Sequence, residues 1–278
     1  VNFYYSLKAL PATALAPRLA DQRVGHFTTS RVDYSEDTSV KPRTHYVKRW
    51  RLEKADPAAA LSAPKEPIVF WLDRNVPEKY RAAVTAGVLE WNQAFAAIGF
   101  ADAIVVKQQA AQDDFSTMDA RHASIRWFTG ADAGFAIGPS QADPRTGEIL
   151  DADIGMSDVF ARGARRLVTE DVGRAPADLL PDDPLYAHKD AMYCSYATEA
   201  AQEMHFAFAL REARGVVMAG PGLTGIAQAT VKSVIMHEVG HALGLRHNFR
   251  ASTAYPLERL RDSGFTREHG ITASVMDY

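Results

Sequence analysis

Eleven residues near the C-terminus constrain this chain more than any other stretch, the sequence HEVGHALGLRH over residues 237–247. Residues four apart on an α-helix lie one above the other on the same face, so His237 and His241 can present two imidazoles to one ion. Glu238 cannot join them as a ligand in that geometry, and it is placed to accept a proton from a water bound to the ion. The spacing therefore predicts a helix that carries a metal site.

A third ligand requires this helix to end. If it continued, His247 would lie roughly on the side opposite His241. Gly244 allows a left-handed backbone conformation, so the chain can turn and bring His247 back to the metal. Three neutral imidazoles with a fourth position left open are typical of a catalytic zinc site. We therefore expect one catalytic Zn²⁺ ion held by His237, His241 and His247.

The chain upstream of the motif has an α/β pattern. Residues 68–72 form a short, continuously apolar run, as in a buried strand. Residues 103–106 and 124–128 favour further strands. Between them, apolar residues at steps of three and four predict one amphipathic helix from Pro77 to Gly99, with the stripe Tyr80, Val84, Val88, Trp91, Phe95 and Ile98.

A hairpin is predicted next, because residues 134–138 and 148–154 flank the turn-rich residues 143–147. From about residue 157 the sequence favours helix, and one helix is expected over 197–214.

Residues 1–66 differ in character from the rest of the chain. Residues 24–34 and 45–52 are rich in β-branched and aromatic residues, and we predict two antiparallel strands joined by a loop. Prolines and alanines between residues 57 and 67 indicate a linker. We therefore divide the chain into a β-rich N-terminal extension with its linker, residues 1–66, and a catalytic domain, residues 67–278.

Composition argues against several function classes. The chain has 31 Lys and Arg against 34 Asp and Glu, which does not favour nucleic acid because phosphate binding needs a basic excess. No apolar run reaches the length of a membrane span. Cys194 is the single cysteine, so neither an intrachain disulfide nor a cysteine metal site is expected. Three turn carboxylates lack calcium-loop spacing and are interpreted as solvated, namely Asp143, Asp151 and Asp153.

The zinc motif resembles that of the metzincin clan of metallopeptidases, HExxHxxGxxH followed by a Met-turn. Residues 274–278, SVMDY, stand where the turn is expected, and the resemblance implies that Met276 is a hydrophobic floor beneath the imidazoles. The chain is also similar to a group of large bacterial metzincin proteins and, more distantly, to the metzincin subunit of a bacterial enterotoxin. The matching stretches span nearly the whole chain: RLADQRVGHFTTS, KRWRLEK, PIVFWLDRNVPEKYRAAVTAGVLEWNQAFAAIGF, DPRTGEIL, HEVGHALGLRHNFRASTAYP and SVMDY.

The resemblance implies an α+β, zincin-like fold with a twisted mixed sheet, an active-site helix and a Met-turn, preceded by a short β-rich extension. Asn248 follows the third histidine, where astacins, matrix metalloproteases, adamalysins and serralysins have other residues, so the chain is not assigned to those four. Metzincins continue beyond the Met-turn into a further helix. We therefore expect a domain truncated after Tyr278 and further domains in a larger parent protein.

The motif and the resemblance together predict a zinc-dependent endopeptidase with Glu238 as general base. Tyr278 is a secondary catalytic candidate, because it matches the Met-x-Tyr of astacins and serralysins, where the tyrosine is a fifth zinc ligand; packing beside the Met-turn is the alternative. A polypeptide substrate is expected to pair with a sheet edge, for which the candidates are Gly134, Phe135, Ala136 and Ile137. An ordinary hairpin strand is the alternative there.

Two other functions stay open at this point. One is a catalytically silent, zinc-containing binding module, which the intact Glu238 disfavours because zinc retention does not require that carboxylate. The other is a zinc hydrolase of a non-peptide or glycosylated substrate, which would use the same metal and base. We expect an exported protein, periplasmic or extracellular.

Overall fold

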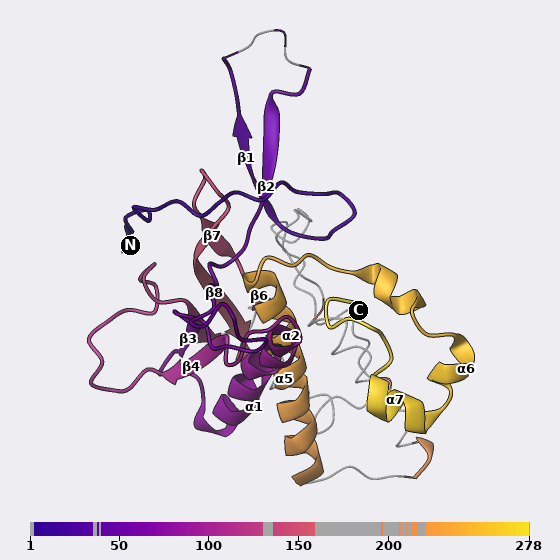
Figure 1. Ribbon diagram of the computed structural model, residues 1–278. Helices are drawn as coiled ribbons and strands as arrows, with labels where there is room; N and C mark the ends of the chain where they lie inside the picture. Colours follow the sequence, from indigo (N-terminus) through magenta and orange to yellow (C-terminus); the bar gives the residue numbers. More distant parts are fainter. Residues whose placement is uncertain are drawn as a thin grey trace.

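The computed structural model describes residues 3–35, 38, 40–129, 136–158, 196, 206, 210, 213–215 and 221–277. These residues form an α+β domain with a twisted mixed sheet, a long helix that carries the histidine motif and a C-terminal turn around Met276 (Figure 1). A two-stranded ribbon precedes it. The helices predicted from residue 157 to residue 214 fall almost entirely outside the described residues.

The main sheet has the strand order β4-β3-β5-β8-β6, and β7 also pairs with β8. Strands β3, β4, β5 and β8 run parallel, whereas β6 and β7 pair antiparallel with β8. Among the described strands, β6 therefore lies at one edge of the sheet. The strand bounds are β3 Ile68–Leu72, β4 Ile104–Gln108, β5 Ser124–Phe128, β6 Ala136–Ile137, β7 Ser140–Ala142 and β8 Ile149–Ser157.

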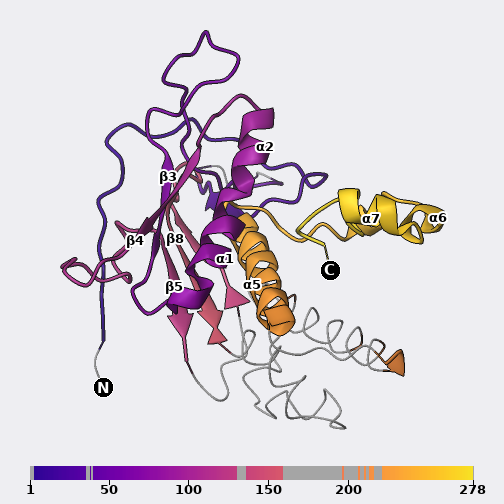
Figure 2. The same cartoon turned by 90° about the horizontal axis from the view of Figure 1, so that it is seen from below.

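Two long helices, α1 (Glu78–Leu89) and α5 (Pro221–Ala242), lie side by side across one face of this sheet (Figures 1 and 2). Between them and the sheet is one apolar core. From α1 it takes Tyr80, Val84 and Val88, and from α5 it takes Val231, Val234, Ile235 and Val239. A buried helix beside parallel strands gives the metal motif a rigid support.

The prediction of a single helix from Pro77 to Gly99 is wrong for the residues after Leu89. Helix α1 ends at Leu89, and a separate α2 covers Trp91–Ala97. Ile98 is 67% exposed, although the stripe placed it in the core. The Ile98 N–H donates to the Phe95 carbonyl three residues back at 3.1 Å, and this tighter last turn rotates Ile98 away from the core.

The N-terminal ribbon consists of β1 (Thr28–Val32) and β2 (Arg43–Val47), paired antiparallel. It extends away from the body of the molecule (Figure 1). The antiparallel pair was predicted, although both strands are shorter than expected. The division of the chain at residue 66 stays a prediction. On the N-terminal side of that boundary, Trp50 and Leu52 pack against the core of the main domain.

The segment after α5 contains the 3₁₀-helix η3 (Phe249–Thr253) and two short helices, α6 (Leu257–Leu260) and α7 (Ser263–His269). Figure 2 shows α6 and α7 to the side of α5, away from the sheet. The chain then returns to α5 for its Met-turn. None of the helices in the described part of the chain is long and apolar enough to cross a membrane.

Candidate metal centre

The helix α5 presents His237 and His241 one turn apart and ends directly afterwards. Gly244 has a φ of +102°, the positive value that its place after the helix predicts. The Leu245 N–H donates to the Gly240 carbonyl at 2.9 Å, and the Gly244 N–H donates to the His241 carbonyl at 2.9 Å. This is the Schellman arrangement that closes many helices, and it reverses the chain toward the metal centre.

The turn brings His247 to the two helical histidines. Their ligand nitrogens all lie within 4.8 Å of one another. Within the described ranges, these three are the one group of at least three His, Cys, Asp or Glu side chains that could hold a metal ion. His237 and His241 are buried, whereas His247 is half-buried.

Hydrogen bonds orient two of the rings. His237 Nδ1 lies 2.7 Å from the Val275 carbonyl oxygen, and His241 Nδ1 lies 2.8 Å from the Leu245 carbonyl oxygen. A carbonyl oxygen only accepts, so each Nδ1 carries the hydrogen and each Nε2 keeps a lone pair for a metal. His241 Nε2 is 3.1 Å from His247 Nε2, close to the ~3.3 Å that two Zn–N bonds of about 2.0–2.1 Å give in a tetrahedral site. The three imidazoles therefore fit zinc.

Burial keeps these histidines neutral. It lowers the pKa of His237 to about 3 and the pKa of His247 to about 4, with a smaller contribution from His241 in both cases. Burial also lowers the pKa of His241 itself. Because the neutral imidazole is the form that binds zinc, the site is ready for a cation at neutral pH.

Glu238 is completely buried on α5, next to the first histidine. Gly138, the residue after β6, lies against it. A Cβ at Gly138 would lie 2.7 Å from the Glu238 carbonyl oxygen and 3.5 Å from Glu238 Oε2. The edge strand therefore passes directly beside the candidate base.

Two of the four residues proposed to contact substrate lie on that strand. Ala136 pairs with Met156, and Ile137 pairs with Gly155, both on β8. Gly134 and Phe135 lie outside the described residues. The assignment of these four residues as a substrate contact stays a prediction.

Met276 is 3% exposed and packs against the helix between two of the ligands. A Cβ at Gly240 would overlap the Met276 sulfur and would lie 2.9 Å from Trp91 Cζ2. The Met276 carbonyl oxygen accepts the N–H of Asn248, the residue after the third histidine, at 2.8 Å. Met276 therefore packs on the helical part of the motif at Gly240 and is hydrogen-bonded to Asn248, which follows its third histidine. Tyr278, the secondary catalytic candidate, lies outside the described residues.

Sequence reasoning missed Asp277, which is 4% exposed beside the Met-turn. Its Oδ2 accepts a hydrogen bond from Ser252 Oγ at 2.6 Å and from Thr272 Oγ1 at 2.5 Å. The carboxylate therefore ties the Met-turn to the segment after the third histidine. The one feature of the sequence that could have pointed to this residue is its position, an acidic residue directly after the methionine.

Tyr196 was also missed. Its ring stacks on His237 with centroids 4.3 Å apart and an angle of 3° between the planes. Its hydroxyl is hydrogen-bonded to Ser233 Oγ, one turn before His237 on α5. Nothing in the sequence around Tyr196 indicates this contact, because it joins residues that are far apart in the chain.

The interpretation of the three turn carboxylates as solvated is wrong. Asp143 is completely buried, and Arg145 pairs with it at 2.7 Å and lowers its pKa. Asp153 accepts a hydrogen bond from Ser124 Oγ at 2.6 Å. Asp151 is 2% exposed, and burial raises its pKa to about 6. These carboxylates are part of the fold around the hairpin turn.

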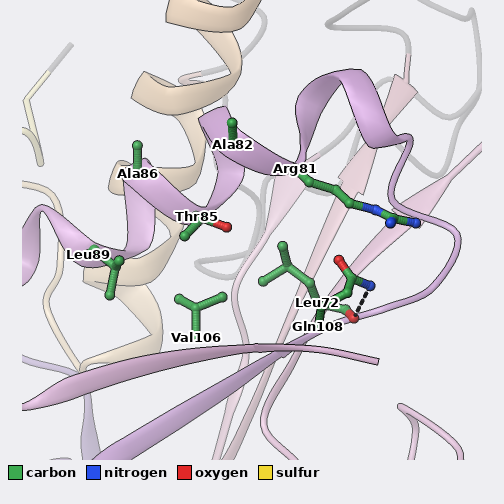
Figure 3. Close-up of a pocket in the computed structure, with 8 residues that line it drawn as sticks. All are labelled: Leu72, Arg81, Ala82, Thr85, Ala86, Leu89, Val106 and Gln108. Atoms are coloured by element: carbon green, nitrogen blue, oxygen red, sulfur yellow. Dashed lines mark hydrogen bonds between the residues drawn. The ribbon is translucent and has the colours of Figure 1, made fainter. Parts of the chain in front are cut away.

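A separate groove lies between α1 and the strands β3 and β4 (Figure 3). Its lining is mostly apolar and includes none of the three histidines; it consists of Leu72, Arg81, Ala82, Thr85, Ala86, Leu89, Val106 and Gln108. Gln108 Nε2 donates to the Leu72 carbonyl oxygen at 3.1 Å, the bond drawn in Figure 3. We assign the chemistry to the histidine centre, where the polar groups converge.

Comparison with known proteins agrees with this site. Residues 223–278 match a protein family described as Met-zincin, and residues 1–55 match a domain of unknown function (DUF5117). No curated protein and no solved structure matches the chain. The Met-zincin match covers nearly all of α5, the three histidines and the Met-turn. The chain therefore contains a metzincin-like domain with three histidines positioned to bind a metal.

Proposed function

We propose that this protein is a zinc-dependent endopeptidase in which Glu238 is the general base. The observation that supports this most is the complete burial of Glu238 directly after the first of three converging histidines. Burying a carboxylate costs several kcal/mol, on the order of what a whole domain can spare. Holding zinc does not require this side chain, so its presence favours catalysis over a silent binding module.

The proposed chemistry divides between the metal and the chain. Zinc, when held by His237, His241 and His247, would polarise the scissile carbonyl and lower the pKa of a water ligand. Glu238 accepts the proton of the attacking water and then delivers it to the leaving amine. Its burial excludes bulk water, so the proton stays within the site between the two steps.

We further propose that the substrate is a polypeptide that binds as an added antiparallel strand along β6. An edge strand has backbone N–H and C=O groups that can pair with an extended peptide. The contact between Gly138 and Glu238 supports this edge, because a peptide paired there would lie beside the base. A complex with a peptidomimetic hydroxamate tests it, and pairing of the inhibitor with any other segment would contradict it.

The mechanism is tested with Glu238→Gln, which keeps the shape of the side chain and removes the base. Hydrolysis of a diverse peptide library should fall by about 10²–10⁴-fold, the usual contribution of a general base. Zinc content by elemental analysis should stay near one ion per chain, whereas His241→Ala should lose both zinc and activity.

Glu90→Gln is the matched control, because Glu90 also reaches α5, through an ion pair with Lys232 at 2.7 Å. It should retain both zinc and hydrolysis. Retention of most activity in Glu238→Gln would show that the assigned mechanism is wrong.

A further inference from the structure

Residues 25–27, just before β1, run beside the turn at the end of α5. The Phe27 N–H donates to the Gly244 carbonyl oxygen at 2.7 Å. The Arg246 N–H donates to the Gly25 carbonyl oxygen at 2.9 Å. The turn is therefore hydrogen-bonded at both of its ends to a segment more than two hundred residues earlier in the chain.

The chain after β2 supports the same turn from a second side. The Lys48 N–H donates to the Phe27 carbonyl oxygen at 2.8 Å. A Cβ at Gly244 would overlap the Lys48 carbonyl oxygen, so the two backbones are in direct contact. Trp50 Nε1 donates to the Ala242 carbonyl oxygen at 3.0 Å, which satisfies one of the carbonyls left without a partner at the end of α5.

These contacts reach two zinc ligands. His26 forms an antiparallel bridge with Leu245, whose carbonyl oxygen accepts the Nδ1 hydrogen of His241. The Phe27 ring packs on the His241 ring, with centroids 5.7 Å apart. His247 lies two residues beyond Leu245. A displacement of the N-terminal segment would therefore move both His241 and His247.

We propose that residues 25–27 are positioning residues of the metal centre, which hold His241 and His247 in the geometry that binds zinc. The part of the chain that matches a domain of unknown function would then complete the zinc site of the metzincin-like domain. The proposal rests on the zinc binding in the proposed function and is independent of the role of Glu238. A merely covering segment would contact side chains, whereas this one is bound to the backbone of the turn.

Phe27→Ala in the full chain tests the proposal, because it removes the ring from His241. Zinc affinity, measured by competition with a chromophoric chelator, should fall by about 10–100-fold, the usual effect of losing support around a ligand. The visible absorption of the cobalt-substituted protein should change as the ligand set is disturbed. Phe27→Leu, which restores apolar bulk, should recover most of the affinity.

Phe115→Ala is the matched control. The Phe115 ring also lies on a histidine, His122, with centroids 4.2 Å apart, but both residues lie between β4 and β5 and His122 is not one of the three converging histidines. It should lower stability and leave zinc affinity and the cobalt spectrum unchanged. Wild-type affinity and spectrum in a folded Phe27→Ala would overturn the proposal.

A second measurement does not depend on the folding of a variant. Coupling between two sites is reciprocal, so zinc should slow hydrogen exchange of the Phe27 and Arg246 amides in the wild-type protein. Equal exchange of these amides with and without zinc would overturn the proposal. The two proposals fail in different ways. An active Glu238→Gln variant with normal zinc affinity would contradict the role of Glu238 as general base, but it would not change what the zinc affinity of Phe27→Ala shows about residues 25–27.

Discussion

Gly240→Ala is the substitution that most directly tests how the Met-turn supports the metal centre. The added Cβ would overlap the Met276 sulfur, and it would lie 2.9 Å from Trp91 Cζ2 and 3.1 Å from Met276 Cε. Carbon atoms in comfortable contact are about 3.5–4.0 Å apart, so the methionine and the indole must both give way. Such overpacking costs about 1–3 kcal/mol of stability.

The displacement should also reach the metal. Val275 precedes the methionine, and its carbonyl oxygen accepts the Nδ1 hydrogen of His237 at 2.7 Å. When the turn moves, this bond lengthens and the ring loses its fixed orientation. Losing such a partner typically costs about 10–100-fold in metal affinity. We therefore expect Gly240→Ala to weaken zinc binding as well as stability.

The assay combines urea unfolding of the zinc-free protein with zinc competition. Gly225→Ala is the control in the same helix, because its Cβ meets no atom within 4 Å. It should stabilise the protein by up to about 1 kcal/mol through helix propensity, with unchanged zinc affinity. In a double-mutant cycle, Met276→Ala should remove part of the overlap and give a coupling energy above ~0.5 kcal/mol. A Gly240→Ala protein with wild-type stability and zinc affinity would refute the argument.

Two further predictions concern buried carboxylates. Burial raises the pKa of Asp151 to about 6, above its value of ~3.9 in the unfolded chain, so its contribution to stability is present below pH ~4 and is lost as the pH rises through 6. Asp151→Asn should therefore flatten the pH dependence of urea unfolding in this window and raise stability at pH 8 by roughly 1–3 kcal/mol; a variant no more stable than wild type at pH 8 would contradict this. Asp277→Ala removes the two hydrogen bonds that its carboxylate accepts from the hydroxyls of Ser252 and Thr272, and should cost about 1–3 kcal/mol on thermal unfolding. Ser252→Ala, which removes only one of these bonds, should cost less than Asp277→Ala, and an equal cost would argue against the shared role of the carboxylate.

The sequence by itself determined the local features of this protein. The strands at 68–72 and 124–128 were predicted to the residue, because short runs rich in β-branched and aromatic residues and bounded by turns favour a strand. The spacing of His237, His241 and Gly244 determined the metal group in the same way, since helix geometry and a positive φ depend only on nearby residues.

Only the tertiary structure decided which distant segments complete the site. The pairing of residues 25–27 with the turn after α5, and the stacking of Tyr196 on His237, join parts of the chain with no shared sequence pattern. The tertiary structure also decided the exposure of Ile98, which depends on the hydrogen bonds at the end of α2. It likewise decided the burial of Asp151, which was predicted from the sequence to be a solvated turn residue. Periodicity reports which face of an element is apolar, but burial, hydrogen-bond partners and pKa depend on the neighbours that folding brings together.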